Sequence, residues 1–429
     1  MSDTATLTID GKTYEFPVIE GTEGERAIDI GTLRQTTGLT TYDPAFGNTA
    51  SCQSAITFID GEKGILRYRG IPIEQFTEHP NFIEVAWLLI FGSLPTREQL
   101  DAFRERLIAN ELLHEGLKVQ LQNIPVDAPP MAILSATVSN LACYHQQFLT
   151  VDTDESLSEA AARLISKVRT IAAFSYRRAM GLPFMYPDPK LGYASNFLHM
   201  MFSIPYQQYE LLPVVAEALN LVFILHADHE QNCSTSTVRA VGSARANLFS
   251  SVSAGISALW GPLHGGANVE VIQMLERIHE GGMTPEECIR LTKDKDKGFR
   301  LFGFGHRVYK NYDPRAKILK ASCDKVFDAL HIQDPLLDIA RKLEELALSD
   351  DYFVERKLYP NVDFYSGLLL RAIGIPTNMF TVIFAIGRLP GWIAQWKEQH
   401  EDATTRIARP RQVYIGENET PYVPIDQRT

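Results

Sequence analysis

The feature that most constrains the fold of this chain is a change of residue pattern near residue 70. Before it, apolar and polar residues alternate on either side of two Asp-Gly pairs, Asp10-Gly11 and Asp60-Gly61, a pattern typical of β-hairpins. After it, the pattern becomes helical and stays so for most of the chain. We therefore predict a mainly α fold with an N-terminal β-rich region over residues 1–70.

Capping residues mark several helix boundaries. Thr96–Gln99 and Thr284–Glu287 each place a threonine three residues before Gln or Glu, the pattern of a capping box at a helix start. Residues 155–179 and 213–225 are further predicted helices, and the second is so apolar that we expect it to be buried. Pattern alone gives no firm domain boundaries.

The charge of the chain bears on its partners and location. A net charge of −11 over 429 residues disfavours nucleic-acid binding, because such binding needs a basic face. No apolar stretch approaches the ~20 residues that cross a bilayer. The N-terminus has neither the basic nor the apolar segment of a signal peptide. We therefore expect a cytoplasmic protein without membrane or nucleic-acid partners.

Histidines with unusual neighbours are the first candidates for chemistry. His226 and His229 lie three residues apart and would share one face of a helix. They could bind a metal, although the segment matches no zinc-protease motif, or they could form hydrogen bonds within a helix bundle. The residues alone leave both interpretations open.

His264 lies between a proline-containing turn and two glycines, which lets a ligand approach the backbone. A run with helical periodicity opens at Asn268, so we expect a helix N-terminus beside His264. Its positive end would lower the pKa of His264 and keep the imidazole neutral and able to donate a hydrogen bond. The alternative is a purely structural turn.

The segment Gly303–Lys310, followed by Arg315, combines glycines, His306 and three cations within an acidic protein. Open backbone N–H groups and clustered cations are typical of an anion-binding loop. A solvated basic turn is the alternative interpretation.

Asp363, Arg388 and Arg409 complete the candidate set. Asp363 has apolar neighbours, so it is either a helix N-cap or a carboxylate with a raised pKa, and the residues favour the cap. Arg388 follows an apolar run and is expected to emerge at the end of a buried segment. Arginines bind carboxylates through two parallel hydrogen bonds, although both could be ordinary surface residues.

No nucleophile motif accompanies these residues. The chain contains no GxSxG, CxxC or GxxxxGK[ST] sequence. Histidines, one aspartate and several arginines suit proton abstraction beside a carbonyl group of a di- or tricarboxylate substrate, without covalent catalysis.

The segments that carry these residues resemble those of the citrate synthases, specifically the longer type found in many Gram-negative bacteria. The similarity covers nearly the whole chain, and the segments follow one another in the family's order. They are Leu225–Asn232 (LHADHEQN), Leu259–Asn268 (LWGPLHGGAN), Gly303–Ala316 (GFGHRVYKNYDPRA), Leu358–Gly367 (LYPNVDFYSG), Met379–Arg388 (MFTVIFAIGR) and Ile407–Gln412 (IARPRQ), with Ser51–Gly70 near the N-terminus.

The resemblance implies a two-domain citrate synthase fold that uses neither a cofactor nor a metal ion. The large helical domain would comprise residues 71–274 and 380–429. The small helical domain, residues 275–379, would close over the substrates. The minimal unit would be a homodimer, with a homohexamer made of three dimers as a further assembly.

The resemblance also implies the reaction, in which acetyl-CoA and oxaloacetate condense to citrate and CoA. The catalytic residues would be His264, His306 and Asp363. Oxaloacetate would be bound by His229, Asn232, Arg315, Arg388 and Arg409, the last reaching in from the partner subunit. CoA would approach Gly303, Phe304, Gly305 and Lys310.

The resemblance leaves substrate choice and regulation open. Propionyl-CoA is an alternative substrate, giving 2-methylcitrate, since one methylene supplies only about 1–3 kcal/mol of discrimination. Metal-dependent hydrolysis and a non-catalytic helical module are the alternatives from other classes. Arg163 and Lys167 match the allosteric NADH site of regulated family members, but residues 108–112 lack its cationic pair and include Glu111. We therefore expect NADH inhibition to be weak or absent.

Overall fold

The computed structural model describes residues 3–428, and its contacts divide the chain into two units. One unit is built from the chain up to Ser54 and from Ala408 onward. The other, called the helical unit below, comprises Ala55–Ile407. The β-rich region predicted for residues 1–70 is therefore shared between two units. The expected large and small helical domains stay a prediction.

The first unit contains a three-stranded antiparallel sheet in the order β1-β2-β3. Its elements are β1 (Thr4–Ile9), β2 (Lys12–Glu20), β3 (Arg26–Ile28), the short helix α1 (Leu33–Thr37) and a 3-10 turn near the C-terminus, η5 (Ile425–Gln427). Ile9 pairs with Lys12, so Asp10 and Gly11 form a two-residue turn, and both have positive φ. This Asp-Gly pair makes the hairpin that the sequence predicts.

The second predicted hairpin belongs to the helical unit. Its strands are β4 (Thr57–Asp60), β5 (Ile65–Tyr68) and β6 (Ile71–Pro72). The turn spans Gly61–Gly64, longer than an Asp-Gly turn. Gly61 lies so close to Val308 that an added Cβ would be 2.3 Å from the Val308 carbonyl oxygen. The Gly61 carbonyl also accepts a hydrogen bond from the Lys310 N–H at 2.8 Å. The hairpin therefore supports a loop far along the chain.

Apart from short 3-10 turns, the other elements described are α-helices. They are α2 (Phe82–Phe91), α3 (Arg97–Ala109), α4 (Glu115–Asn123), α5 (Pro130–Tyr144), α6 (Asp154–Ala179), α7 (Tyr193–Phe202), α8 (Pro213–Leu225), α9 (Cys233–Gly242), α10 (Leu248–Leu259), α11 (Ala267–Glu280), α12 (Pro285–Lys293), α13 (Pro314–Leu330), α14 (Pro335–Leu348), α15 (Asp351–Glu355), α16 (Val362–Ile373) and α17 (Phe380–Glu401). The fold is thus mainly α with a small β region, as predicted.

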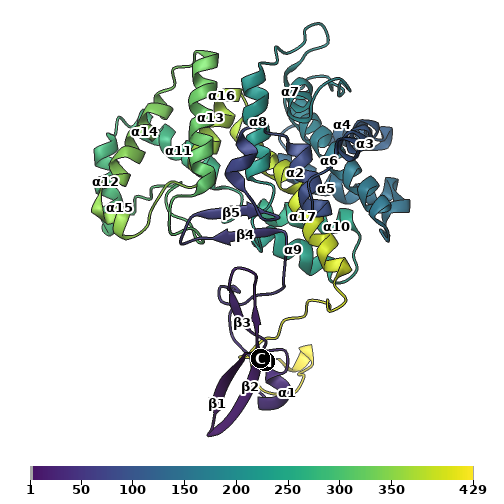
Figure 1. Ribbon diagram of the computed structural model, residues 1–429, viewed down its shortest axis with the longest axis vertical. Coiled ribbons are helices and arrows are strands. Elements are labelled where there is room, and N and C mark those ends of the chain that lie inside the picture. Colours follow the sequence, from purple (N-terminus) through teal and green to yellow (C-terminus); the bar gives the residue numbers. More distant parts are fainter. Residues whose placement is uncertain (1–2, 429) are drawn as a thin grey trace. The chain divides into compact units, whose positions relative to one another are not determined.

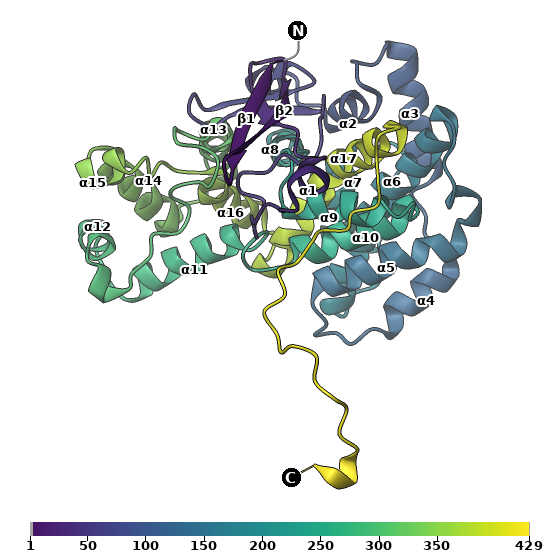
Figure 2. The same ribbon diagram turned by 90° about the horizontal axis from the view of Figure 1, so that it is seen from below.

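Helix α17 runs through the middle of the helical unit. It packs against α2, α6, α8, α9 and α10, and most of its side chains are buried. Helices α11 to α16 lie on one side of it and α3 to α6 on the other (Figures 1 and 2). The apolar helix α8 buries Val222, Phe223, Ile224 and Leu225 in the core, as its composition predicts. Helices α8 and α17 therefore both lie within the core of this unit.

Side chains cap helices where the sequence predicts. Thr96 and Gln99 form reciprocal hydrogen bonds at the start of α3. Thr284 accepts a hydrogen bond from the Glu287 N–H at the start of α12, whereas the Glu287 carboxylate pairs with Arg290. The second capping box is therefore only half formed.

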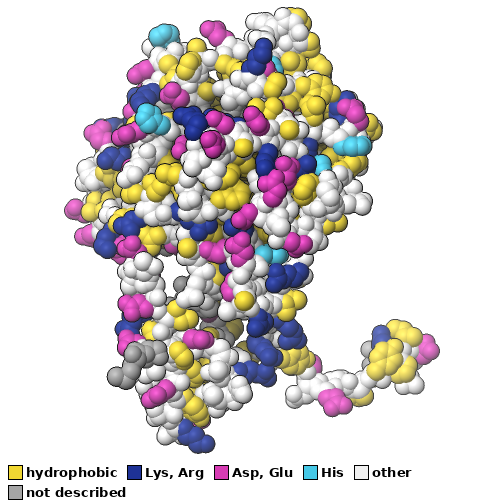
Figure 3. All heavy atoms as spheres, turned by 45° about the vertical axis from the view of Figure 1, so that its right-hand side comes forward, with side chains coloured by type: hydrophobic (Ala, Val, Ile, Leu, Met, Phe, Trp, Pro, Cys, Tyr) yellow, Lys and Arg dark blue, Asp and Glu magenta, His cyan; other side chains and the backbone are white. Residues whose placement is uncertain are grey.

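The surface of the helical unit mixes charges of both signs on the face shown in Figure 3. Acidic and basic side chains are interspersed there rather than gathered in one basic patch. Within residues 3–428, no helix combines the length and the apolar character needed to span a bilayer.

Candidate active site

The connection between α8 and α9 carries His226, His229 and Asn232. It is not helical, so the two histidines do not share a helix face. His226 ends α8 as its C-cap, and its Nδ1 donates to the Val222 carbonyl at 2.7 Å. Asn232 is the N-cap of α9, where its Oδ1 accepts from the Thr235 N–H at 3.1 Å. Asn232 therefore has a structural role, and its contact with substrate stays a prediction.

His264 is held by the N-terminus of α9. The Ser234 N–H donates to Nε2 of His264 at 3.2 Å, and the Ser234 hydroxyl lies 2.9 Å from the same nitrogen. Because a ring nitrogen that accepts a backbone N–H carries no proton, the neutral ring has its proton on Nδ1. Burial, aided by the charge of Arg388, lowers the pKa of His264 to about 4. His264 is therefore the neutral donor that the sequence predicts, but its ring is bound by a residue of α9 and not by the N-terminus of α11.

His306 has the opposite tautomer. Its Nδ1 accepts from the N–H groups of Val308 at 2.9 Å and Tyr309 at 3.2 Å, so the proton is on Nε2. Burial, aided by the charge of Arg315, lowers the pKa of His306 to about 4. His264 and His306 therefore each offer a neutral imidazole donor, Nδ1–H and Nε2–H respectively.

His229 lies beside His306, with 5.5 Å between the ring centroids. Its Nε2 is 3.3 Å from the Tyr309 hydroxyl. Burial, followed by the charge of Arg315, lowers the pKa of His229 well below its usual value. All three imidazoles are therefore neutral at pH 7, which leaves the arginines as the positive charges.

Asp363 lies in the first turn of α16, and the predicted cap role is wrong. The N-cap is Asn361, whose Oδ1 accepts from the Asp363 N–H at 3.0 Å. The Asp363 carboxylate accepts no hydrogen bond from any residue that the structure describes. Burial raises the pKa of Asp363 to about 6, although Arg315 opposes the shift. The second interpretation of the sequence, a carboxylate with a raised pKa, is the one that holds.

Arg315 lies at the start of α13, and Asp313 binds it in two-point fashion. The Arg315 Nε and Nη2 donate to the two carboxylate oxygens at 3.0 and 2.9 Å, and both residues are buried. Although burial opposes its charge, Asp313 raises the pKa of Arg315. Nη1 has no hydrogen-bond partner among the described residues, so one edge of the guanidinium is open to a ligand.

Arg388 lies in the middle of α17, so the expectation that it ends a buried segment is wrong. The helix continues to Glu401, and Arg388 is almost fully buried. Its Nε donates to the His226 carbonyl at 2.5 Å, whereas its buried Nη1 has no partner within residues 3–428. Burial lowers the pKa of Arg388 to about 10. A buried unpaired donor costs free energy, so the site favours an anionic ligand that completes the pairing.

The loop before α13 is shaped by Gly303 and Gly305, which have φ of +81° and +78°. A Cβ at Gly303 would lie 2.7 Å from a phenylalanine ring, so no other residue fits. Asn361 ties the loop to α16, with its N–H on the Gly303 carbonyl at 2.9 Å and its Nδ2 on the Gly305 carbonyl at 2.8 Å. Phe304 is half-buried and Lys310 exposed. The predicted CoA residues therefore share one fixed loop.

Arg409 belongs to the other unit and is exposed there. A contact between Arg409 and oxaloacetate stays a prediction.

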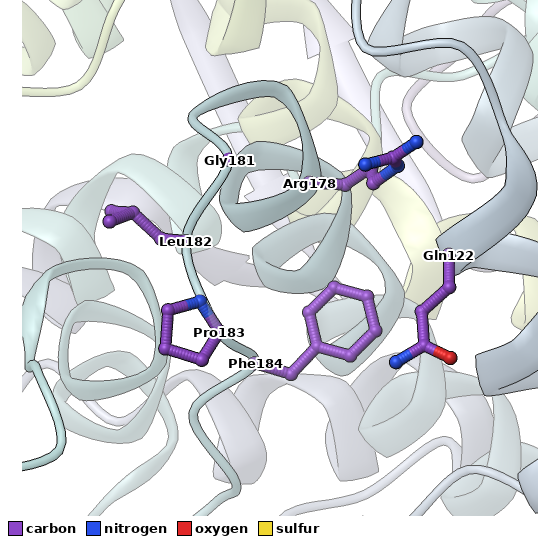
Figure 4. A pocket seen from close by; sticks show the side chains of 6 residues that line it. All are labelled: Gln122, Arg178, Gly181, Leu182, Pro183 and Phe184. Atoms are coloured by element: carbon purple, nitrogen blue, oxygen red, sulfur yellow. The ribbon is translucent and has the colours of Figure 1, made fainter.

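Two other features of the helical unit bear on the alternative chemistries. The described residues contain no group of three or more His, Cys, Asp or Glu placed to hold a metal ion. A hollow of about 390 Å³ is lined by Gln122, Arg178 and the segment Gly181–Phe184 (Figure 4). It contains none of the predicted site residues and no general acid or base.

Sequence reasoning missed the residues that hold the candidate catalytic side chains in place. Asp313 and Asn361 each precede a helix directly, and Asp313 is followed by Pro314, so helix-start signals could have identified both. Ser234 gave no such signal, because its partner His264 is 30 positions away.

Known proteins share the sequence and the fold of this chain. The family model described as "Citrate synthase, C-terminal domain" matches residues 45–411. "Citrate synthase 1" of Mycobacterium tuberculosis is 53% identical over 426 residues, which is 99% of each chain. The chain is thus similar along its whole length to a curated citrate synthase.

Solved structures show the same similarity. Citrate synthase from Pyrobaculum aerophilum is 35% identical with a TM-score of 0.81, over 99% of this chain and 100% of that one. The enzyme from Thermoplasma acidophilum, solved as a ternary complex with carboxymethyl coenzyme A and oxaloacetate, is 32% identical with a TM-score of 0.79, over 89% and 98% of the two chains. The chain therefore belongs to the citrate synthase family, acyltransferases that condense acetyl-CoA with oxaloacetate to give citrate and CoA.

Proposed function

We propose that His264, His306 and Asp363 carry out this condensation in the entry step of the tricarboxylic acid cycle. The observation that carries the proposal is that burial keeps both imidazoles neutral and backbone N–H groups fix their tautomers, while burial raises the pKa of Asp363 to about 6. A base with a pKa near the working pH combines a large ionised fraction with useful basicity.

Asp363 would remove a methyl proton from acetyl-CoA. A carboxylate is far too weak a base to do so alone, so the enolate oxygen must be stabilised as its charge develops. The Nδ1–H of His264 would donate a hydrogen bond to that oxygen without transferring a full proton. The enolate carbon would then attack the oxaloacetate carbonyl, and the Nε2–H of His306 would polarise this carbonyl and protonate the new alkoxide. Hydrolysis of citryl-CoA would release both products.

Two arginines and a histidine would hold the carboxylates of oxaloacetate. Arg315 has an open Nη1 and Arg388 a buried Nη1 without a partner in the described chain, so each can donate a hydrogen bond to a carboxylate oxygen. His229, neutral and next to His306, would add a hydrogen bond and orient the ketone. Arg409 would complete the set from the partner subunit of a homodimer, and Asn232 would contact substrate from the cap of α9.

The loop at Gly303, Phe304 and Gly305 would receive CoA, with Lys310 near its phosphates. The small domain, residues 275–379, would close over both substrates and exclude water while the enolate exists. We place the enzyme in the cytoplasm, and among the longer Gram-negative type that also forms hexamers. The segment Ser51–Gly70, which resembles that of this type, supports the subtype.

We also propose that NADH regulates this enzyme weakly or not at all. The Lys167 ammonium is buried and donates to the carbonyls of Asn110 and Leu112. Arg163 pairs with Glu159 on its own helix. Both cations that match the regulatory site therefore already have partners, and burial lowers the pKa of Lys167 to about 8.

Release of CoA with oxaloacetate as co-substrate tests the reaction, with acetyl-CoA and propionyl-CoA compared at equal concentration. We expect kcat/KM to be higher with acetyl-CoA. The matching relatives are citrate synthases, so the 2-methylcitrate alternative is not favoured. A clear preference for propionyl-CoA would restore it.

A further inference from the structure

Asp313 is a buried carboxylate that touches two of the functional elements at once. Its Oδ1 accepts from the backbone N–H and the Nε of Arg315, each at 3.0 Å. Its Oδ2 accepts from Nη2 of Arg315 at 2.9 Å and from the backbone N–H of Val362 at 3.1 Å. Val362 is the first residue of α16 and directly precedes Asp363. One side chain therefore joins an arginine of α13 to the helix that carries the proposed base.

We propose that Asp313 is a positioning residue that sets the geometry of Arg315 and Asp363 together. This inference rests on the proposed roles of those two residues. Asp313 is 1% exposed and Arg315 3% exposed, so solvent does not weaken the pairing. Four donors occupy its two oxygens, which leaves the carboxylate little freedom to rotate.

The contact with α16 adds to the cap made by Asn361. The Asn361 side chain accepts a hydrogen bond from the Asp363 N–H, and the Asp313 side chain accepts one from the Val362 N–H. Two successive N–H groups of the first turn are therefore bound by different side chains. The direction of the Asp363 side chain follows from this turn. Small displacements of a catalytic group of about 1 Å cost rates of the order of a hundredfold.

Asp313 contacts Arg315 and α16 through different hydrogen bonds, so its effects on Arg315 and on Asp363 can be tested separately. Asp313→Asn removes the negative charge and at least one of the two oxygens that accept hydrogen bonds from Arg315. The positions of both Arg315 and Asp363 should therefore be disturbed. We expect KM for oxaloacetate to rise about tenfold and kcat to fall about tenfold or more. Glu111→Gln is the matched control, because Glu111 is likewise buried and pairs with Arg169 at 2.5 Å. It should lower thermal stability similarly and leave KM and kcat as in the wild type.

Val362→Pro isolates the contact with α16. Proline lacks the N–H that Asp313 accepts, yet it suits the first position of a helix, and Asn361 has the extended backbone that precedes proline (φ −108°, ψ 179°). We expect kcat to fall about tenfold while KM for oxaloacetate stays within twofold, because Arg315 keeps its partner. Val362→Ala, which shortens the same side chain but keeps the N–H, is the reference for this variant.

The outcomes separate this inference from the proposed function. If Arg315→Lys and Asp363→Asn keep wild-type KM and kcat, the proposed roles of those residues fail. If those variants lose activity but Asp313→Asn behaves like Glu111→Gln, the positioning role is refuted alone. Should Asp313→Asn not fold, the comparison of Val362→Pro with Val362→Ala decides, and equal kcat in the two would overturn the inference.

Discussion

Replacing Asp363 by Asn should make the enzyme inactive and at the same time more stable. The amide keeps the size of the side chain but cannot accept a proton, so kcat should fall by about 10²–10⁴-fold. Oxaloacetate affinity should change little, because the arginines proposed to bind it are untouched. The gain in stability is the sharper prediction, since a residue that only packs would not give it.

Its size follows from the pKa of Asp363. The native carboxylate has a pKa of about 6 against an ordinary value of 3.8, so the native state binds the proton more tightly than the unfolded state. Ionisation therefore costs stability as the pH rises from 3.8 through 6. At pH 8 the cost is about 3 kcal/mol, and at pH 5 about half of that. Asn carries no charge and avoids the cost.

Thermal unfolding of both proteins at several pH values provides the assay. With an unfolding entropy of about 2.1 cal/mol/K per residue, 3 kcal/mol corresponds to a Tm about 3 °C higher for this chain at pH 8. The difference should shrink at pH 5. A variant with unchanged or lower Tm at pH 8, or a gain independent of pH, would refute the buried-carboxylate argument. In the wild type, kcat should also rise with pH through about 6.

Other predictions address the remaining sites. Arg388→Lys keeps the charge but loses the planar fork, so KM for oxaloacetate should rise more than tenfold, and an unchanged KM would place the substrate elsewhere. In mixed dimers of Arg409→Ala and His264→Ala chains, one of the two sites should be intact if Arg409 acts across the interface; dimers as inactive as the parents would assign Arg409 to its own subunit. Because Lys167 and Arg163 already have partners, NADH titrated at subsaturating acetyl-CoA and low salt should inhibit weakly, and strong inhibition at micromolar NADH would contradict this.

The candidate segments can be recognised in the sequence because their chemistry is local. His264 and His306 stand beside glycines, and the Asp-Gly hairpin and the Thr96 cap depend on residues close together in the chain. Burial lowers the pKa of both histidines, but Ser234, the partner of His264, comes from a helix distant in sequence. Tautomers of this kind depend on tertiary contacts that no local pattern encodes.

Among the predictions that failed, those for Asp363 and Arg388 have clear physical reasons. Asn361 and Asp363 lie two positions apart, and both residue types are suitable N-caps. Asn361 is the cap because its backbone is extended, whereas Asp363 already lies in the first turn of α16. Arg388 follows an apolar run, but the run continues after it through a helix that tolerates an internal proline, Pro390. A charged residue can thus lie deep in a core although burial preferences alone predict the surface.

The protonation of His264 and His306 tests the central claim most directly. ¹⁵N-histidine NMR, with His264→Gln and His306→Gln used to assign the two rings, reports tautomer and charge between pH 5 and 8. We predict that neither ring titrates in that range and that the proton is on Nδ1 of His264 and on Nε2 of His306. Titration of either ring near its ordinary value of about 6.5, or the same tautomer in both, would contradict catalysis by neutral hydrogen-bond donors.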